Sequence, residues 1–224
     1  MHISYLALIV ISLALGLGTQ AYIKLTYRRW SQVPLSNGMS GRQMAERMLA
    51  TNGIGSVPIY NNGGADLSDY YDPKSDALYL SGGSERGASV ASAAVACHEA
   101  GHATQHARDY APARVRMAIV PLANIGSQAW MVVLLLGIML NASGLVTLGI
   151  VLFALVVAFE LVTLPVEFDA SRRALQYISG APGVTADEAR GARQVLTAAA
   201  LTYVAAALSS ILQLLYLLGQ NRDE

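Results

Sequence analysis

The sequence contains one short pattern whose residue types and spacing suit metal chemistry, His98-Glu99-Ala100-Gly101-His102. Residues four apart lie on the same face of a helix, so both imidazoles can bind one ion. Zinc prefers such nitrogen ligands, and an open coordination position keeps a water bound. Glu99 is turned by about 100° from His98 around the helix, so it can reach that water and act as a general base. The pattern therefore predicts zinc-dependent hydrolysis.

The surroundings of this pattern favour a metal site over a chance match on a solvated amphipathic helix. The chain has four histidines, and three of them fall at positions 98, 102 and 106, on one helical face. The neighbouring residues are small and apolar, which is typical of a packed helix. His106 lies about 6 Å beyond His102 along the axis, so it is either an outer residue of the site or an exposed polar residue. Cys97 points away from this face, and we expect it to pack in the core.

A third ligand is expected farther along the chain, where three acidic residues qualify: Glu160, Glu167 and Asp169. Glu160 and Glu167 share a helical face but lie about 10 Å apart along the axis, so both cannot bind one ion. Glu160 also lies deeper in an apolar run, where an ionised carboxylate is costly. We therefore predict Glu167 as the third ligand; the alternative is a surface ion pair with Arg172 or Arg173. Either arginine could stabilise the oxyanion of hydrolysis, although headgroup contact is commoner for such arginines.

The composition places these residues in a membrane protein. Of the 224 residues, 54% are hydrophobic and 13% are charged, and this charged share is about half of that in a soluble domain. The mean hydropathy is +0.41, and 15 basic residues balance 15 acidic ones. A soluble enzyme, a disordered chain and an electrostatic nucleic-acid binder are therefore disfavoured. One cysteine excludes an internal disulfide framework and a multi-cysteine zinc module.

Four apolar runs are long enough to cross the hydrocarbon core as helices, which takes about 20 residues each. We expect a mainly α-helical integral membrane protein with a small cytoplasmic α+β region that carries the zinc-binding helix. The predicted spans are 3–23, 117–140, 145–165 and 195–218. The expected units are 1–23 (first transmembrane helix), 24–116 (cytoplasmic region), 117–165 (a hairpin of two helices), 166–194 (cytoplasmic segment with the third ligand) and 195–224 (fourth helix and tail).

The basic residues are distributed unevenly between the two sides that four alternating spans create. Fourteen of them fall on the side of 24–116 and 166–194, and Arg222 alone falls on the other. Because positively charged loops stay in the cytoplasm, we expect a cytoplasmic polar region with both termini outside. The basic cluster follows the first span instead of preceding it, so this span is expected to be a retained anchor and not a signal peptide.

The pattern within 24–116 predicts a few short elements beside the zinc-binding helix. A helix with one apolar face is expected over 40–50, and a long alanine-rich helix over 84–108. Residues 57–60 and 77–80 are expected to form short strands, and the glycine-rich 61–73 a loop. One hypothesis is that Leu78, Tyr79 and Leu80 pair with an extended peptide substrate as an edge strand. Farther on, Thr185 and Glu188 fit a capping box that opens the helix leading into the fourth span.

Four segments carry a family resemblance: LSDYYDPKS (67–75), LS (80–81), HEAGHATQHA (98–107) and LPVEFDASRRA (164–174). The chain resembles the bacterial membrane-bound neutral zinc metallopeptidases of the YugP type over nearly its whole length. The resemblance implies a gluzincin-like site with one Zn²⁺, held by His98, His102 and Glu167, and with Glu99 as catalytic base. In the more distantly similar HtpX and prenyl-protein (CAAX) proteases, Ala-Asp follows the third glutamate at a fixed interval. This chain has Ala-Ser there, at 170–171.

Two functions follow from these observations. The favoured one is a membrane-embedded zinc endopeptidase of the bacterial inner membrane. It would hydrolyse membrane or membrane-proximal proteins at the cytoplasmic face, with a zinc-bound water activated by Glu99. Its partners would be a peptide or protein substrate, the lipid bilayer and a regulatory membrane protein, but no nucleic acid. The alternative is a non-catalytic membrane adaptor in which zinc only stabilises the fold. A metal transporter is less favoured, because the histidines lie outside the predicted spans.

Overall fold

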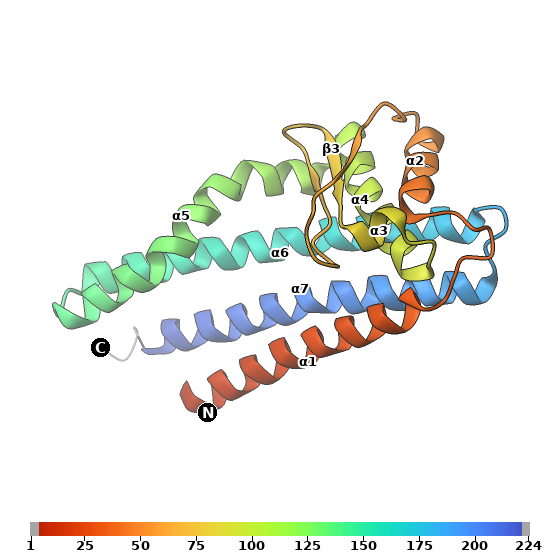
Figure 1. Cartoon of the computed structure of the whole chain (residues 1–224). Coiled ribbons are helices and arrows are strands. Elements are labelled where there is room, and N and C mark those ends of the chain that lie inside the picture. Colours follow the sequence, from red (N-terminus) through yellow and green to blue (C-terminus); the bar gives the residue numbers. More distant parts are fainter. Residues whose placement is uncertain (1–4, 221–224) are drawn as a thin grey trace.

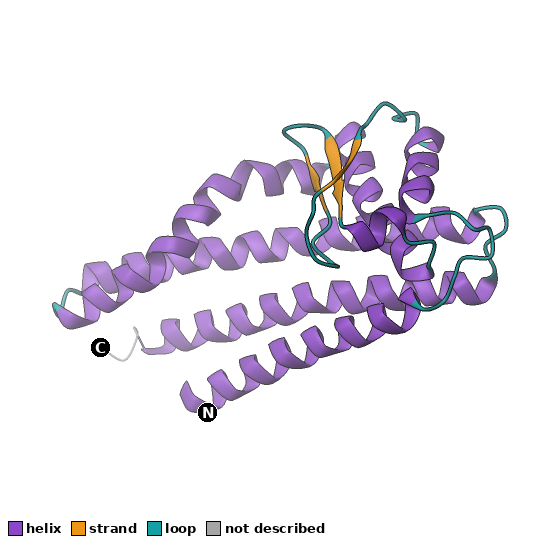
Figure 2. Ribbon diagram, viewed as in Figure 1, coloured by secondary structure: helices purple, strands orange, loops and turns teal. Residues whose placement is uncertain are grey.

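In the computed structural model, which describes residues 5–220, four long helices extend side by side from a small cap (Figures 1 and 2). The helices are α1 (Tyr5–Ser31), α2 (Gly41–Thr51), α3 (Gly82–Arg86), α4 (Val90–Ala107), α5 (Ala111–Met139), α6 (Ser143–Gly180) and α7 (Ala186–Gln220). The strands are β1 (Ile59–Asn61), β2 (Tyr70–Asp72) and β3 (Ala77–Leu80). The cap holds α2, α3, α4 and the sheet, and the start of α1 and the end of α7 lie at the far end of the molecule (Figure 1).

The long helices α1, α5, α6 and α7 are each long and apolar enough to cross a membrane. The predicted mainly helical membrane fold with a small α+β region is therefore confirmed. The predicted hairpin is also present, because α5 ends at Met139 and α6 begins at Ser143. The first two residues of the first predicted span, and Arg222 with the end of the tail, lie outside the described residues.

The membrane helices run well beyond the predicted spans at the cap end. The helix α6 continues without a break to Gly180 and passes through Pro165, so most of the predicted segment 166–194 is not a separate unit. Once a helix has formed, each further residue adds a hydrogen bond, so polarity alone does not end it. The helix α5 begins at Ala111 and bends along its length (Figure 1), and Pro121 lies inside it. As a result, Glu167 stands on a rigid extension of a membrane helix.

The helix predicted over 84–108 is in fact two helices, α3 and α4. The chain leaves the helical path at Gly87, and the Ser89 side chain accepts a hydrogen bond from the Ser92 amide to cap α4. The break lets residues 88–90 bond to the chain after α1, where the Val90 amide donates to the Val33 carbonyl at 2.9 Å. The alanine content concealed this interruption, although Gly87 and Ser89 were signals for it.

The sheet corrects two expectations. Its strand order is β1-β3-β2, with β1 parallel and β2 antiparallel to β3. Strand β2 falls in the segment predicted to be a loop. The prediction that Leu78, Tyr79 and Leu80 pair with a substrate is wrong, because β1 and β2 occupy both edges of β3. Burial of an apolar central strand explains this, since Leu78 and Leu80 are fully buried.

Two predicted helix starts are confirmed by their caps. Ser40 and Gln43 form a reciprocal capping box at the start of α2. At the start of α7, the Thr185 amide donates to Glu188 Oε2 at 2.6 Å, and the Glu188 amide donates to Thr185 Oγ1 at 3.3 Å. The other carboxylate oxygen of Glu188 accepts from the Ser36 amide at 2.6 Å. This contact fixes the chain after α1 to the start of α7.

The helix α4 is the centre of the cap, and nearly all of it is buried against α2, α6 and α7. It approaches α6 closely at Gly101, where an added Cβ would lie 2.7 Å from the Ala170 carbonyl oxygen. Only glycine allows two helix backbones to come this close without displacing one of them. The contact brings the two histidines of α4 to the level of Glu167 on α6.

We expect Gly101→Ala to push α4 away from α6 and to lower the stability of the protein by about 1–3 kcal/mol. Thermal unfolding in detergent should show a lower Tm, and the zinc content of the purified protein should fall with it. The control is Gly18→Ala in α1, where an added Cβ meets nothing within 4 Å. An unchanged Tm and zinc content in Gly101→Ala would show that this close approach does not position the site.

Candidate metal centre

Within residues 5–220, one group of side chains is arranged to hold a metal ion: His98, His102 and Glu167. Glu167 Oε2 lies 3.2 Å from His98 Nε2 and 3.6 Å from His102 Nε2. The two Nε2 atoms are 3.2 Å apart. The two imidazoles come from successive turns of α4, and the carboxylate comes from α6. The structure thus brings together the three residues that the sequence analysis selected as ligands.

These distances fit zinc. Bonds of about 2.0–2.1 Å at tetrahedral angles place ligand atoms about 3.3–3.4 Å from one another, and the three observed distances bracket this value. Two imidazole nitrogens and a carboxylate oxygen converge here on one point, which a cation would occupy favourably. The Glu167 side chain is only 2% exposed, and a buried charge needs such a partner.

The ring of His98 is oriented from α6. Ser171 Oγ lies 3.1 Å from His98 Nδ1, one helical turn beyond Glu167. When Nδ1 donates its proton to the hydroxyl, Nε2 is left with a free electron pair that points to Glu167. Ser171 is the residue at which the chain departs from the Ala-Asp pattern of the more distant proteases. The group that contacts this histidine from α6 is therefore a neutral hydroxyl.

The ring of His102 is oriented by Gln105, one turn farther along α4. The Gln105 amide group donates to the Val166 carbonyl at 2.7 Å and to Asp169 at 3.0 Å, both on α6. These two acceptors fix the side chain so that Gln105 Oε1 lies 3.0 Å from His102 Nδ1. Nδ1 then carries the proton, and Nε2 is free to bind a metal. The sequence analysis missed Gln105 and Ser171, although their spacing of three and four residues from two ligands was a usable signal.

Arg172 and Arg173, the candidates predicted to stabilise the oxyanion, do not face the metal ligands. Both pair with Asp169, Arg172 through a short contact and Arg173 Nε at 2.6 Å. Asp169 in turn accepts from Gln105, so its carboxylate supports the site from outside and is not a ligand. The alternative of an ion pair between Glu167 and these arginines is not observed. Instead, Arg116 of α5 lies 3.5 Å from Glu167 Oε1.

The other two candidates also lie outside the metal group. Glu160 is two helical turns before Glu167 along α6, too far to reach the same ion. His106 lies one turn beyond His102, and its Nδ1 is 2.5 Å from the Tyr71 hydroxyl. That hydroxyl donates to Asp76 at 2.6 Å. His106 therefore links α4 to strand β2, and its place is at the rim of the site.

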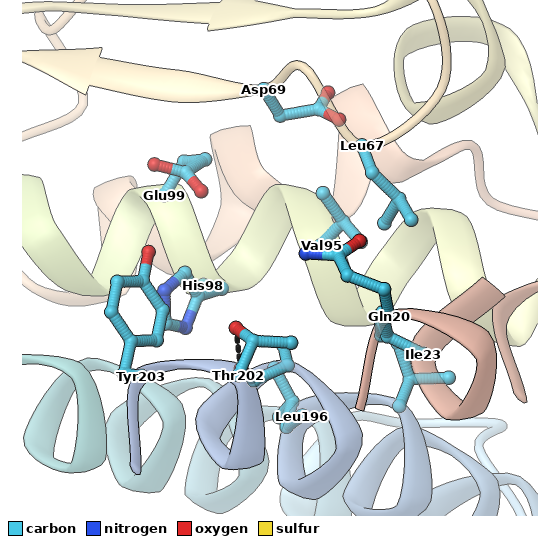
Figure 3. A pocket seen from close by; sticks show the side chains of 12 residues that line it. Gln20, Ile23, Leu67, Asp69, Val95, His98, Glu99, Leu196, Thr202 and Tyr203 are labelled. Carbon is cyan, nitrogen blue, oxygen red and sulfur yellow. Dashed lines mark hydrogen bonds between the residues drawn. The ribbon is translucent and has the colours of Figure 1, made fainter. Parts of the chain in front are cut away.

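A cavity of about 220 Å³ opens beside His98 and Glu99 (Figure 3). Its lining comes from α1, α4, α7 and the segment before β2, and it includes Gln20, Leu67, Asp69, Thr202 and Tyr203. A second cavity of about 230 Å³ lies next to His102, against β2 and α5. The metal group therefore borders two cavities, and the sequence analysis predicted neither.

Glu99 lies where it can exchange a proton with a water molecule or a substrate bound beside the metal ligands. It follows His98 in α4, and its side chain lines the same cavity as His98, Asp69 and Tyr203 (Figure 3). The residue is only 7% exposed. Burial raises the pKa of the Glu99 carboxyl above its ordinary value, while the two histidines act in the opposite direction. Burial also raises the pKa of Asp69, which accepts a hydrogen bond from the Ser81 amide at 2.7 Å.

Two histidines at a spacing of four, an intervening glutamate and a carboxylate from a second helix define the class of site: a mononuclear zinc site of hydrolytic enzymes. Comparison with known proteins agrees with this class. Residues 5–222 match the family model described as "Putative neutral zinc metallopeptidase". A Bacillus subtilis (strain 168) protein named "Putative membrane protease YugP" is 40% identical over 211 residues, which cover 94% of this chain and 93% of that protein.

The chain belongs to this family of neutral zinc metallopeptidases. No solved structure matches it. Membership makes the chain a zinc-dependent, membrane-embedded hydrolase and identifies its cofactor as Zn²⁺. The fit of His98, His102 and Glu167 to a zinc ion is an independent observation from the geometry.

Loss of the ligand Glu167 should reduce zinc affinity more than loss of Ser171, which only orients the ligand His98. Glu167→Ala should leave no tightly bound zinc, because it removes one of three protein ligands. Ser171→Ala should weaken zinc binding about 10–100-fold, the usual effect of losing a hydrogen bond to a ligating histidine. Competition with a chelator on purified protein measures both. Ser127→Ala, which removes an exposed hydroxyl on α5, is the control. A full zinc complement in Glu167→Ala would reject the assignment of this residue.

Proposed function

We propose that this protein is a zinc endopeptidase that cleaves membrane or membrane-proximal proteins at the cytoplasmic surface of the bacterial inner membrane. The observation that carries the proposal is the position of Glu99, at the edge of a cavity and one residue from a ligand of the metal triangle. A zinc ion held by His98, His102 and Glu167 supplies electrostatic activation of the attacking water and of the scissile carbonyl.

Glu99 would carry the proton through the reaction. Its carboxylate accepts a proton from the attacking water, whose oxygen forms the new bond to the carbonyl carbon. The same carboxyl then gives the proton to the leaving amine when the carbon–nitrogen bond breaks. Ser171 and Gln105 hold the two histidine rings in the tautomer that faces Glu167. No covalent intermediate between the protein and its substrate is required.

The two cavities favour cleavage within a chain over removal of a terminal residue. One lies at His98 and Glu99 and the other at His102, so a bound polypeptide has room on both sides of the metal group. The first cavity has walls from two membrane helices, with Ile23 on α1 and Leu196 on α7. Apolar residues at these walls suit a substrate segment that emerges from the bilayer.

An adaptor with a purely structural zinc site is the weaker alternative. A structural site is closed by four protein ligands, whereas the structure offers three and a cavity beside them. Partner capture that survives the loss of Glu99 would favour the adaptor. A regulatory membrane partner is compatible with either function.

We expect Glu99→Gln to retain zinc and the wild-type Tm but to lose peptidase activity by at least about 10²–10⁴-fold, because the amide cannot accept the proton. The measurement is cleavage of fluorescence-quenched peptides by protein in nanodiscs, with zinc content measured on the same sample. Glu46→Gln, on the exposed end of an ion pair with Arg42, is a matched control. Equal cleavage by wild type and Glu99→Gln would contradict the mechanism.

The proposed orientation can be tested with single cysteines, because Cys97 is buried. Ser143→Cys lies at the exposed start of α6, next to the α5–α6 connection, and Ala65→Cys lies in the exposed loop before β2. A membrane-impermeant maleimide should label Ser143→Cys from outside the inner membrane, and it should label Ala65→Cys only after the membrane is permeabilised. The reverse pattern would place the metal centre on the outer side and would contradict a cytoplasmic site.

A further inference from the structure

Hydrolysis of a peptide bond needs a group that stabilises the negative charge on the carbonyl oxygen. The arginines expected to do this are unsuitable. Asp169 engages both, and the Arg172 side chain is 71% exposed. His106 is tied to Tyr71 at the rim. None of the residues that the sequence analysis selected as oxyanion donors is therefore free to serve, and the donor must be another residue at the cavity beside Glu99.

The fourth membrane helix brings one such residue to the cavity. Tyr203 of α7 lines the same cavity as His98 and Glu99. In Figure 3 its ring lies beside His98, and its hydroxyl points toward Glu99. The hydroxyl also interacts with two carboxylates, with Glu167 through charge and a hydrogen bond and with Glu99 through charge. At 39% exposure, the side chain remains accessible to a bound substrate.

We propose that Tyr203 is a catalytic residue that donates a hydrogen bond to the oxyanion, an inference that rests on the proposed peptidase function. As the water oxygen bonds to the carbonyl carbon, the electron pair of the carbonyl π bond moves onto the carbonyl oxygen, and Glu99 takes the proton of the water. The Tyr203 hydroxyl turns from the carboxylates to this oxygen and stays protonated. When the carbonyl re-forms, the leaving amine takes the proton from Glu99.

The position of Tyr203 supports a role in the transition state better than a role in holding the metal. The two histidine ligands are already oriented by Ser171 and Gln105 from the far sides of their rings. Arg116 is the competing donor, but it pairs with Glu167 Oε1 and lines the second cavity, beside His102. Tyr203 is on the Glu99 side, where the water that Glu99 activates must lie.

The experiment compares Tyr203→Phe with wild type in nanodiscs by three measurements. The first is zinc content and the second is kcat and KM on quenched peptides. The third is the affinity for a phosphinic peptide, whose tetrahedral phosphorus oxygens imitate the oxyanion. Tyr216→Phe is the control, because Tyr216 packs on Tyr5 at the far end of α7. We expect Tyr203→Phe to keep its zinc and its KM but to lose about 10²–10³-fold in kcat.

The phosphinic peptide should bind Tyr203→Phe more weakly by a similar factor. Binding of an ordinary peptide to Glu99→Gln should be the same with and without the second substitution Tyr203→Phe. Wild-type kcat and phosphinic affinity in Tyr203→Phe would overturn the proposal, as would loss of zinc in that variant. Loss of phosphinic affinity in Arg116→Gln alone, with full zinc, would assign the oxyanion to Arg116 instead.

These outcomes separate this inference from the proposed function. If wild type cleaves no peptide, the endopeptidase proposal fails, while the difference in phosphinic affinity between wild type and Tyr203→Phe still decides whether Tyr203 faces the oxyanion position. If Glu99→Gln abolishes cleavage and Tyr203→Phe does not reduce it, the function stands and this inference is rejected.

Discussion

The metal centre depends on the close contact between α4 and α6 at Gly101 and Ala170. Its ligands belong to two helices of different kinds. One is the buried helix of the cap, and the other is the extension of a membrane helix. The backbones come so close at Gly101 that a single methyl group would collide with the carbonyl of Ala170. Any separation at this point would move Glu167 away from both histidines. The geometry of the site therefore depends directly on how α4 packs on α6.

The hydrogen bonds around the ligands extend this constraint outward. Gln105 bonds to His102 on its own helix and to Asp169 on the neighbouring one. Asp169 is held by two arginines that follow it on α6. The charged groups around the metal ligands are thus each paired with a neighbour. This arrangement agrees with a composition in which only 13% of residues are charged. Arg172 and Arg173 therefore hold Asp169 in position and do not take part in the reaction.

Sequence reasoning reached the ligands because their chemistry leaves a local signature. Two histidines four apart can be recognised on any helix. The rise per residue lets only one of Glu160 and Glu167 bind the ion, and Glu167 was selected because Glu160 lies deeper in the apolar run. The same reasoning failed where distant segments decide the outcome. Strand β2 lies in a segment rich in turn residues, and it forms because β3 offers it an edge. Tyr203 is 104 positions from Glu99, and no periodicity connects a membrane helix to a cavity in the cap.

The burial of Glu167 gives a physical reason to regard zinc as part of the folded state. A carboxylate that is 2% exposed loses most of its hydration, and two neutral imidazoles facing it with their electron pairs cannot offset that cost. One arginine, Arg116, contributes at the other carboxylate oxygen, at 3.5 Å. A divalent cation among the three ligand atoms would compensate the charge where it is least hydrated. Metal binding and the docking of α4 on α6 should therefore stabilise each other, because the ligands meet only in the folded protein.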